Sequence, residues 1–431
     1  MPDALAPPLD AADPRAALRP VVAFLILLAL LVGLTPFQDL SSTRMVEHAT
    51  GQEVPTYALL AALDLAGLVL VAAAGRRALL SLLRTPTVLL GLWLALTSLV
   101  FSADPAASVR RLVLTLLTLG AAALVPLLAR DLRQFRDLLL AAAASVLALS
   151  YAGLLLSPDL AIHQRTDILE PQLAGEWRGL YGHKNLAGGV MAVLALVGLF
   201  GAATGRGVLG GLVAAGALVF LLGSGGKSAT GLITVAGLAA WGIGAVRSPA
   251  LRAVIAFTPL VALNLLTVGS VALPAVGALV AALPVDATFT GRTDIWSFAL
   301  AGVAEAPWTG HGFSAFWGSA RTLFGAEDAT VWAGEAATSH NAYLDLALTI
   351  GLPGLGLTLW AFVWAPLRNA CAALGHPGNR GLARFLVAVW LFSLYLGAFE
   401  AYILTRAEPL WFLLALSLCG LRYAALRPVR P

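Results

Sequence analysis

Residues 337–354 read Ala-Thr-Ser-His-Asn-Ala-Tyr-Leu-Asp-Leu-Ala-Leu-Thr-Ile-Gly-Leu-Pro-Gly, and here the longest polar interval of the chain enters a hydrophobic segment. The apolar run 341–366 is long enough to cross a bilayer, which takes roughly 20 helical residues. His340 and Asn341 stand at the mouth of this predicted helix. An imidazole and an amide held at a membrane surface by a rigid element are suited to chemistry on a lipid-borne substrate.

The composition places the whole chain in the class of polytopic membrane proteins. Of its 431 residues, 59% are hydrophobic and 12% are charged, and the mean hydropathy is +0.86. A soluble domain has fewer hydrophobic and more charged residues than this. The sequence pI is about 9.3, but the basic residues are scattered between apolar runs, as the positive-inside rule produces. We therefore expect no binding of nucleic acid. The two cysteines, Cys371 and Cys419, fall on the predicted cytoplasmic side and imply no disulfide.

The apolar runs predict an all-α fold with about twelve transmembrane helices. They cover residues 20–36, 57–74, 86–102, 110–129, 137–156, 185–204, 207–223, 228–246, 253–271, 341–366, 385–399 and 408–425. Arginines gather in alternate connections, which predicts that these connections and both termini are cytoplasmic. The first run is followed by no cleavage site of small residues, so we expect a retained span.

The predicted organisation has five parts and two long outward connections. The parts are a cytoplasmic tail at 1–19, nine transmembrane helices at 20–284, a large periplasmic loop at 285–340, three transmembrane helices at 341–425 and a cytoplasmic tail at 426–431. The segment 272–284 is too short and too rich in Pro and Gly for a separate span. The outward connections at 157–184 and 285–340 carry the densest polar chemistry of the chain.

Cations stand beside glycine, histidine and asparagine at the start of two predicted spans. One group is Arg178, His183, Lys184 and Asn185, and the other is Lys227 within Gly-Ser-Gly-Gly-Lys-Ser-Ala-Thr at 223–230. Glycines let backbone amides approach an anion, and lysine or arginine supplies the charge. The glycine turn lacks the spacing of a nucleotide-binding P-loop. The alternative is that these cations only anchor lipid headgroups.

The large loop adds Arg292 with Trp296 and a second imidazole, His311. His183, His311 and His340 could in principle form a metal triad, but they lack paired spacing and no acidic residue stands beside them in the sequence, so we expect no metal. His163 lies in a polar loop without a pattern, and we assign it no function. Glu400 either pairs with Arg406 in the last outward connection or reaches the cavity of the candidate site; the sequence leaves both open.

Three groups of residues resemble the O-antigen ligase and polysaccharide polymerase superfamily, and most of all its exopolysaccharide polymerase branch. They are Gly182-His183-Lys184-Asn185 with Arg178 upstream, Arg292 with Trp296, and His340-Asn341 followed by Leu344, Gly351 and Gly354. Members often carry arginine where this chain has Lys227. The resemblance implies a GT-C-like glycosyltransferase of the bacterial inner membrane with its active site on the periplasmic face.

The implied reaction moves an undecaprenyl-pyrophosphate-linked glycan to a hydroxyl group, with inversion and without metal or another cofactor. His340 and Arg292 would be catalytic, and a further set would bind the pyrophosphate or the substrate: Arg178, His183, Lys184, Asn185, Lys227, His311 and Asn341. The acceptor would be a growing glycan for a polymerase, or lipid A core or a protein for a ligase. Membrane lipids, a flippase and a chain-length regulator are the expected partners. A twelve-span solute transporter is the alternative from another class.

Overall fold

The computed structural model describes residues 14–33, 35–41, 53–168, 170–284, 286–317 and 336–426. These residues form helices joined by mostly short connections, and within them no strand is present; the one β-type contact is an isolated antiparallel bridge between Ile162 and Trp177. The predicted all-α fold is confirmed for this part of the chain. Residues 1–13, 318–335 and 427–431, which include Arg321 and Phe324 of the predicted large loop, lie outside the described residues.

Every predicted span coincides with a helix. These helices are α1 (Pro14–Val32), α2 (Glu53–Leu80), α3 (Thr85–Leu99), α4 (Pro105–Leu128), α5 (Leu132–Leu156), α7 (Lys184–Ala203), α8 (Gly207–Gly223), α9 (Lys227–Ala245), α10 (Pro249–Leu266), α16 (Ala342–Leu359), α18 (Arg380–Leu396) and α19 (Pro409–Leu426). Among the described residues, 8 helical segments are long and apolar enough to cross a membrane, and α1, α3 and α8 contribute shorter apolar helices. The protein is a multi-pass membrane protein, and the number twelve remains a prediction.

Shorter elements fill the connections. The first long connection holds α6 (Pro158–Ala161) and the single turn η3 (Pro171–Leu173). The segment 272–284 is not a span of its own: α11 (Val268–Ala272) and α12 (Pro274–Ala281) follow α10 as two short helices. In the predicted large loop, α13 (Arg292–Glu305) is the longest described helix. After α16 the chain continues through the π-helical turn η4 (Trp360–Trp364) into α17 (Ala365–Gly375), and the turn η5 (Pro377–Asn379) precedes α18.

Glycines set the contact between α7 and α8, the most closely packed helix pair. A Cβ atom on Gly198 would lie 2.4 Å from the backbone nitrogen of Ala214, and one on Gly210 would lie 2.3 Å from that of Ala202. Small residues of this kind let two membrane helices approach backbone to backbone. The contact fixes the position of α7, whose first turn carries the Lys184–Asn185 pair.

Helix α16 is broken near its middle, and the segment after α13 fills the break. Gly351 has φ 69° and ψ 174°, a conformation that glycine adopts without steric cost. A Cβ atom there would lie 2.4 Å from the carbonyl oxygen of Trp308. The backbone nitrogens of His311 and Gly312 donate to the carbonyls of Leu348 and Thr349 at 3.0 Å each. The break therefore anchors part of the predicted large loop against the helix that begins beside His340.

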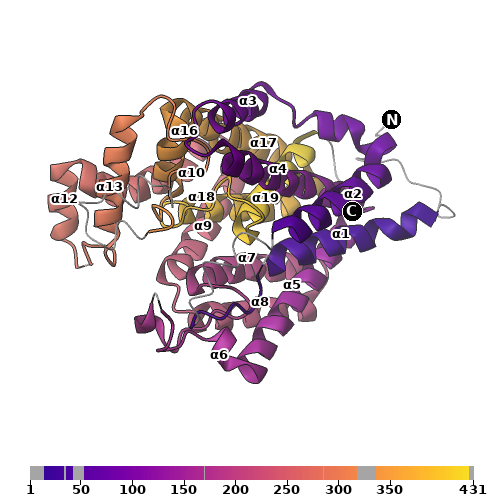
Figure 1. Ribbon diagram of the computed structural model, residues 1–431. Helices are drawn as coiled ribbons and strands as arrows, with labels where there is room; N and C mark the ends of the chain where they lie inside the picture. Colours follow the sequence, from indigo (N-terminus) through magenta and orange to yellow (C-terminus); the bar gives the residue numbers. More distant parts are fainter. Residues whose placement is uncertain are drawn as a thin grey trace.

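Figure 1 shows α12 and α13 together at one edge of the molecule, with the C-terminal helices α18 and α19 in its interior. Helices α18 and α19 are almost entirely buried, and their rings Trp390, Trp411 and Phe412 have no exposed surface. The candidate residues His183, Asn185, Arg292, His340 and Asn341 lie where α7, α13 and α16 begin. The connection 397–408, between α18 and α19, supplies the remaining side chain of the site.

Candidate functional site

Asn341, and not His340, caps helix α16. Its side-chain oxygen accepts the backbone N–H groups of Tyr343 at 3.0 Å and Leu344 at 2.9 Å, as an N-cap asparagine does. Its side-chain nitrogen donates to Asn264 Oδ1 and to the carbonyl of Ala398, both at 3.1 Å. Asn341 has no exposed surface. Its hydrogen-bonding groups are thus occupied within the protein, whereas the sequence led us to expect contact with substrate.

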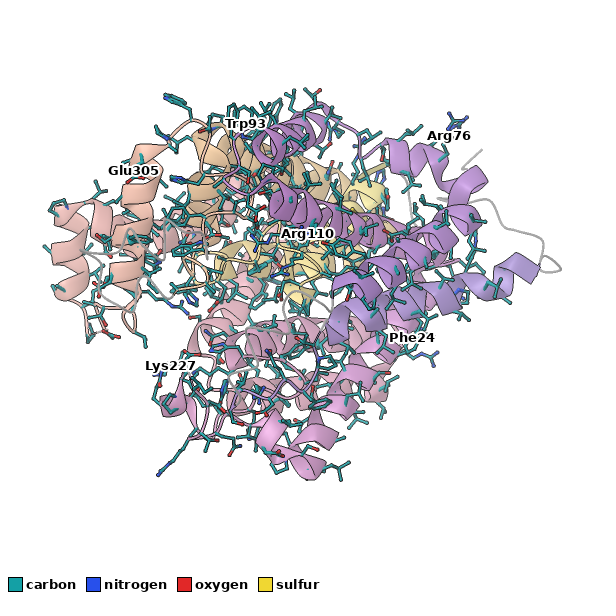
Figure 2. All side chains as sticks on the ribbon, in the orientation of Figure 1. Phe24, Arg76, Trp93, Arg110, Lys227 and Glu305 are labelled. Atoms are coloured by element: carbon teal, nitrogen blue, oxygen red, sulfur yellow. The ribbon has the colours of Figure 1, made fainter. Side chains whose placement is uncertain are left out.

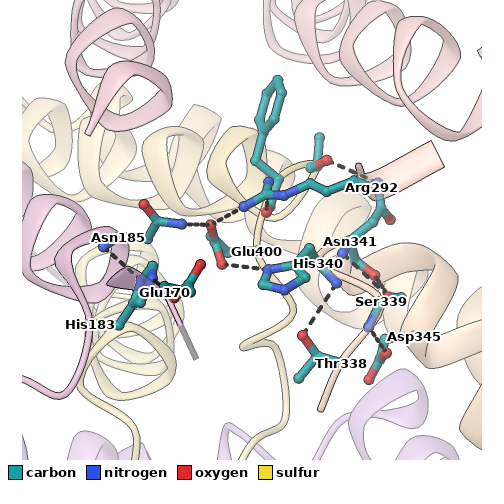
Figure 3. A network of polar contacts seen from close by, with 12 residues as sticks. Glu170, His183, Asn185, Arg292, Thr338, Ser339, His340, Asn341, Asp345 and Glu400 are labelled. Atoms are coloured by element: carbon teal, nitrogen blue, oxygen red, sulfur yellow. Dashed lines mark hydrogen bonds and ion pairs between the residues drawn. The ribbon is translucent and has the colours of Figure 1, made fainter. Parts of the chain in front are cut away.

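His340 lies just before this cap in a left-handed backbone conformation, with φ 52°. Histidine and asparagine adopt this region more often than most residues. The conformation turns the imidazole away from the helix axis toward Glu400, whose Oε2 atom lies 3.4 Å from His340 Nδ1 (Figure 3). About one third of the His340 side chain, 34%, is exposed. The imidazole is therefore held on one side and open on the other.

The residue before His340 is held by two side chains, and a third side chain fixes one of these two. The backbone N–H of Ser339 donates to Asp345 Oδ1 at 3.0 Å, and the indole of Trp317 donates to the same oxygen at 2.8 Å. The indole of the buried Trp296, on α13, donates to the carbonyl of Ser339 at 2.9 Å. These contacts hold both sides of the Ser339 peptide. The segment that carries His340 is consequently rigid where it enters the site.

The start of helix α7 forms a second part of the site, next to the part formed by His340 and Ser339. His183 is its N-cap, and His183 Nδ1 accepts the backbone N–H of Asn185 at 3.1 Å. Its other ring nitrogen, Nε2, lies 2.8 Å from Glu170 Oε2. Since Nδ1 accepts, Nε2 carries the proton and donates it to the carboxylate. His183 thus orients the first turn of α7, and with it the side chain of Asn185.

A second histidine, His163, supports the same turn. His163 Nε2 accepts the backbone N–H of Lys184 at 3.3 Å, and His163 Nδ1 lies 2.9 Å from Asp167 Oδ2. Burial lowers the pKa of His163 by more than the hydrogen bond to Asp167 raises it. The sequence assigned His163 no function, and the structure gives it a structural position, as a buried part of the start of α7. No sequence pattern marked it, because its partners lie 4 and 21 residues away in an irregular loop.

Glu400 connects the start of α7 with the starts of α13 and α16. Its Oε1 atom accepts from Asn185 Nδ2 at 2.9 Å and from Arg292 Nη2 at 3.0 Å, and its Oε2 atom faces His340 (Figure 3). Arg292, the first residue of α13, also donates through Nη1 to the carbonyl of Phe399 at 2.7 Å. Of the two possibilities for Glu400, the structure favours the second, because its carboxylate contacts Asn185, Arg292 and His340 of the candidate site. One carboxylate thus contacts an amide, a guanidinium and an imidazole.

Hydrogen bonds and a neighbouring charge set the ionisation of the two carboxyl groups in the site. Burial by itself would raise the pKa of Glu400, but the hydrogen bond to His340 and the charge of Arg292 outweigh it and lower the pKa to about 2. The hydrogen bond from His183 lowers the pKa of Glu170. Both carboxyl groups are therefore ionised at neutral pH. No acidic residue stands beside the histidines in the sequence, but the fold brings Glu170 to His183 across 13 residues of chain and Glu400 to His340 across 60.

The other candidate cations are placed differently from one another. Arg178 has no exposed surface, and its Nη1 atom donates to the carbonyl of Gln38 at 2.8 Å. Lys184 forms an ion pair with Glu176 at 2.6 Å. Lys227 begins α9 and is exposed (Figure 2). The polar contact of His311 is elsewhere: its Nε2 atom lies 2.8 Å from the carbonyl oxygen of Gly302, away from Glu400.

The structure thus brings His183, Asn185, Arg292 and His340 to one network and leaves Arg178, Lys227 and His311 outside it. His183, His311 and His340 do not form a triad. In the described part of the chain, no group of three or more His, Cys, Asp or Glu side chains is arranged to hold a metal ion.

The fold and the site define a class: a multi-pass helical membrane protein with a polar centre of charged side chains where several of its helices begin. Residues 187–359 match the family model described as O-antigen ligase, which confirms, over this part of the chain, the resemblance seen in the sequence. The matched segment runs from the first turns of α7 to the end of α16 and includes Arg292, His340 and Asn341. The comparison with curated proteins found no match.

Proposed function

We propose that the protein is a glycosyltransferase that transfers an undecaprenyl-pyrophosphate-linked glycan to an acceptor hydroxyl on the periplasmic face of the inner membrane. The observation that carries this proposal is the Glu400 carboxylate, which holds Arg292 and His340 in one site. A cation that can bind pyrophosphate and an imidazole that can take a proton then stand on either side of one carboxylate. These two groups can supply the proton acceptor and the charge stabilisation that glycosyl transfer from a pyrophosphate donor uses.

His340 would act as the general base. Its Nδ1–H points to the ionised Glu400, which leaves Nε2 as the nitrogen that can accept the proton of the acceptor hydroxyl. A carboxylate behind an imidazole fixes its tautomer and stabilises the imidazolium that forms. The open third of the His340 side chain, 34%, gives the acceptor a path to the ring.

Arg292 would stabilise the leaving group. Departure of the glycan leaves negative charge on the pyrophosphate, and a guanidinium can meet two phosphate oxygens at once. Asn185 lies beside Arg292 on the same carboxylate oxygen and could donate to the same phosphate. Attack by the hydroxyl opposite the leaving group would invert the anomeric centre. Cationic and amide donors would take the place of a divalent metal, as the sequence led us to expect.

The test is turnover by the purified protein in lipid nanodiscs with a lipid-linked oligosaccharide. A polymerase lengthens the lipid-linked glycan when the donor is supplied alone, whereas a ligase forms product only after lipid A core is added. We propose the polymerase activity, in keeping with the Gly-His-Lys-Asn motif at 182–185. Product formation should survive extensive treatment with EDTA. Loss of product that added metal restores would overturn the metal-free mechanism, and solute uptake by the protein in sealed lipid vesicles, without transfer, would overturn the function.

A further inference from the structure

Two of the groups assigned to pyrophosphate binding already share one anionic oxygen. Asn185 Nδ2 and Arg292 Nη2 converge on Glu400 Oε1 at 2.9 and 3.0 Å. They come from the starts of α7 and α13, which are separated by more than a hundred residues of chain. A guanidinium and an amide that converge on one charged oxygen form the contact that proteins use for a phosphate oxygen. The carboxylate of Glu400 occupies the place such an oxygen would take.

Arg292 is largely enclosed. Its Nη1 atom is bound to the carbonyl of Phe399 at 2.7 Å, and only 17% of the side chain is exposed. A phosphate oxygen that took the position where Asn185 and Arg292 converge would have to displace Glu400 from Nη2. The Arg292–Glu400 pair is also neutral, so the pair as it stands offers a pyrophosphate little net attraction.

The contact from Glu400 to His340 is long by comparison. The 3.4 Å between His340 Nδ1 and Glu400 Oε2 exceeds the usual range for a strong charge-assisted hydrogen bond, about 2.7–2.9 Å. The carboxylate is therefore held mainly by its contacts with Asn185 and Arg292. If these two released it, the same carboxylate could move to the imidazole and form a short hydrogen bond with it.

We propose that Glu400 is an internal substitute for the donor pyrophosphate, and that the donor displaces it from Arg292 and Asn185 onto His340. The proposal rests on the proposed function and deepens it. Donor binding would exchange one anion for another at Arg292, so that no cation is left unpaired in either state. The released carboxylate would strengthen the base only once a donor is present. Glu400 is then a positioning residue for His340 and a competitor of the donor.

Binding of undecaprenyl pyrophosphate to the protein in nanodiscs tests the exchange. Glu400→Gln keeps the shape of the side chain but removes the charge that competes with the phosphate. We expect it to tighten binding at least about fivefold, the lower end of ordinary coupling between sites. Arg292→Ala should weaken binding. Glu170→Gln is the matched control, because it removes a carboxylate from the same site that contacts His183 and not Arg292.

A kinetic measurement separates this role from a purely structural one. With lipid-linked oligosaccharide as donor, Glu400→Gln should lower the KM for donor and also lower kcat, because His340 loses its carboxylate partner. A carboxylate that only holds the fold together would, when removed, raise KM and lower kcat. Normal detergent-extracted yield and a single cooperative thermal unfolding transition of the variant establish that the fold is retained.

Each outcome bears on a distinct part of the argument. Tighter binding by Glu400→Gln and not by Glu170→Gln supports the exchange. If both variants bind alike, the effect is general loss of negative charge, and the exchange is overturned. If binding needs Arg292 but is unchanged or weaker in Glu400→Gln, the exchange fails and the proposed function stands. If the wild-type protein does not bind undecaprenyl pyrophosphate, both fail.

Discussion

Arg292 holds two acceptors of neighbouring residues at once: its Nη1 atom donates to the carbonyl of Phe399 at 2.7 Å, and its Nη2 atom donates to the carboxylate of Glu400 at 3.0 Å. The guanidinium thereby fixes the connection between α18 and α19 against the start of α13. This connection carries the carboxylate that faces His340. A change at Arg292 therefore affects the position of Glu400 as well as the charge available to a donor.

Replacement of Arg292 by lysine should rescue transfer only in part. A lysine ammonium is a point charge on a flexible stem and cannot present the two parallel N–H groups of a guanidinium. We expect Arg292→Ala to lower kcat/KM by at least about 10²-fold, as loss of one charge-stabilising donor does, and Arg292→Lys to lie between alanine and wild type. Initial rates with a lipid-linked oligosaccharide measure this. Full activity of the lysine variant would contradict the two-pronged contact.

Asparagine at position 340 should fold well and transfer poorly. Asparagine tolerates the left-handed backbone conformation of His340, and Asn341 remains in place to cap α16. The imidazole is lost, so we expect transfer to fall by at least about 10²-fold, the lower end for general-base catalysis. Product formation by His340→Asn, His340→Gln and His340→Ala, each at normal detergent-extracted yield, checks this. Transfer near the wild-type rate in the asparagine variant would exclude His340 as the base.

Asp345 should be replaceable by asparagine but not by leucine. The oxygen that accepts from Ser339 and Trp317 is present in asparagine, so Asp345→Asn should retain most of the transfer activity. Asp345→Leu leaves the Ser339 N–H and the Trp317 indole without their acceptor, which costs about 1–3 kcal/mol for each buried group. Thermal stability and kcat should both fall in the leucine variant. Equal loss in the two variants would show that the charge, and not the acceptor, is what matters.

Glu400 should contribute stability that depends on pH below about 4.5. Its pKa is lowered from 4.5 to about 2 in the folded protein, so its stabilising contribution is complete above the unfolded pKa and is lost as the pH falls through the folded one. The difference in melting temperature between wild type and Glu400→Gln should thus be constant above about pH 5 and become smaller toward about pH 3. Thermal unfolding in detergent measures both proteins. A difference that does not change with pH in this interval would contradict the lowered pKa.

The sequence by itself determined the class of the protein and most of its helices. Apolar runs of sufficient length form helices in a membrane, because every backbone group must find its hydrogen bond within the segment. Their ends were less well predicted: the first span was expected at 20–36, but α1 ends at Val32, where Gly33 takes φ 82°. The family resemblance, carried by a few polar residues at helix starts, was likewise available from the sequence.

Only the tertiary structure decided which polar residues meet. Glu400 contacts Asn185 across 215 residues of chain and Arg292 across 108, and nothing local in the sequence ties it to either. Arg178, Lys184 and Arg292 look alike as cations in polar surroundings, yet one is buried against Gln38, one is paired with Glu176 and one with Glu400. The hydrophobic pattern fixes where a helix forms, since it acts within one segment. The partner of a charge depends on how whole helices pack, and that is settled by contacts between segments distant in the chain.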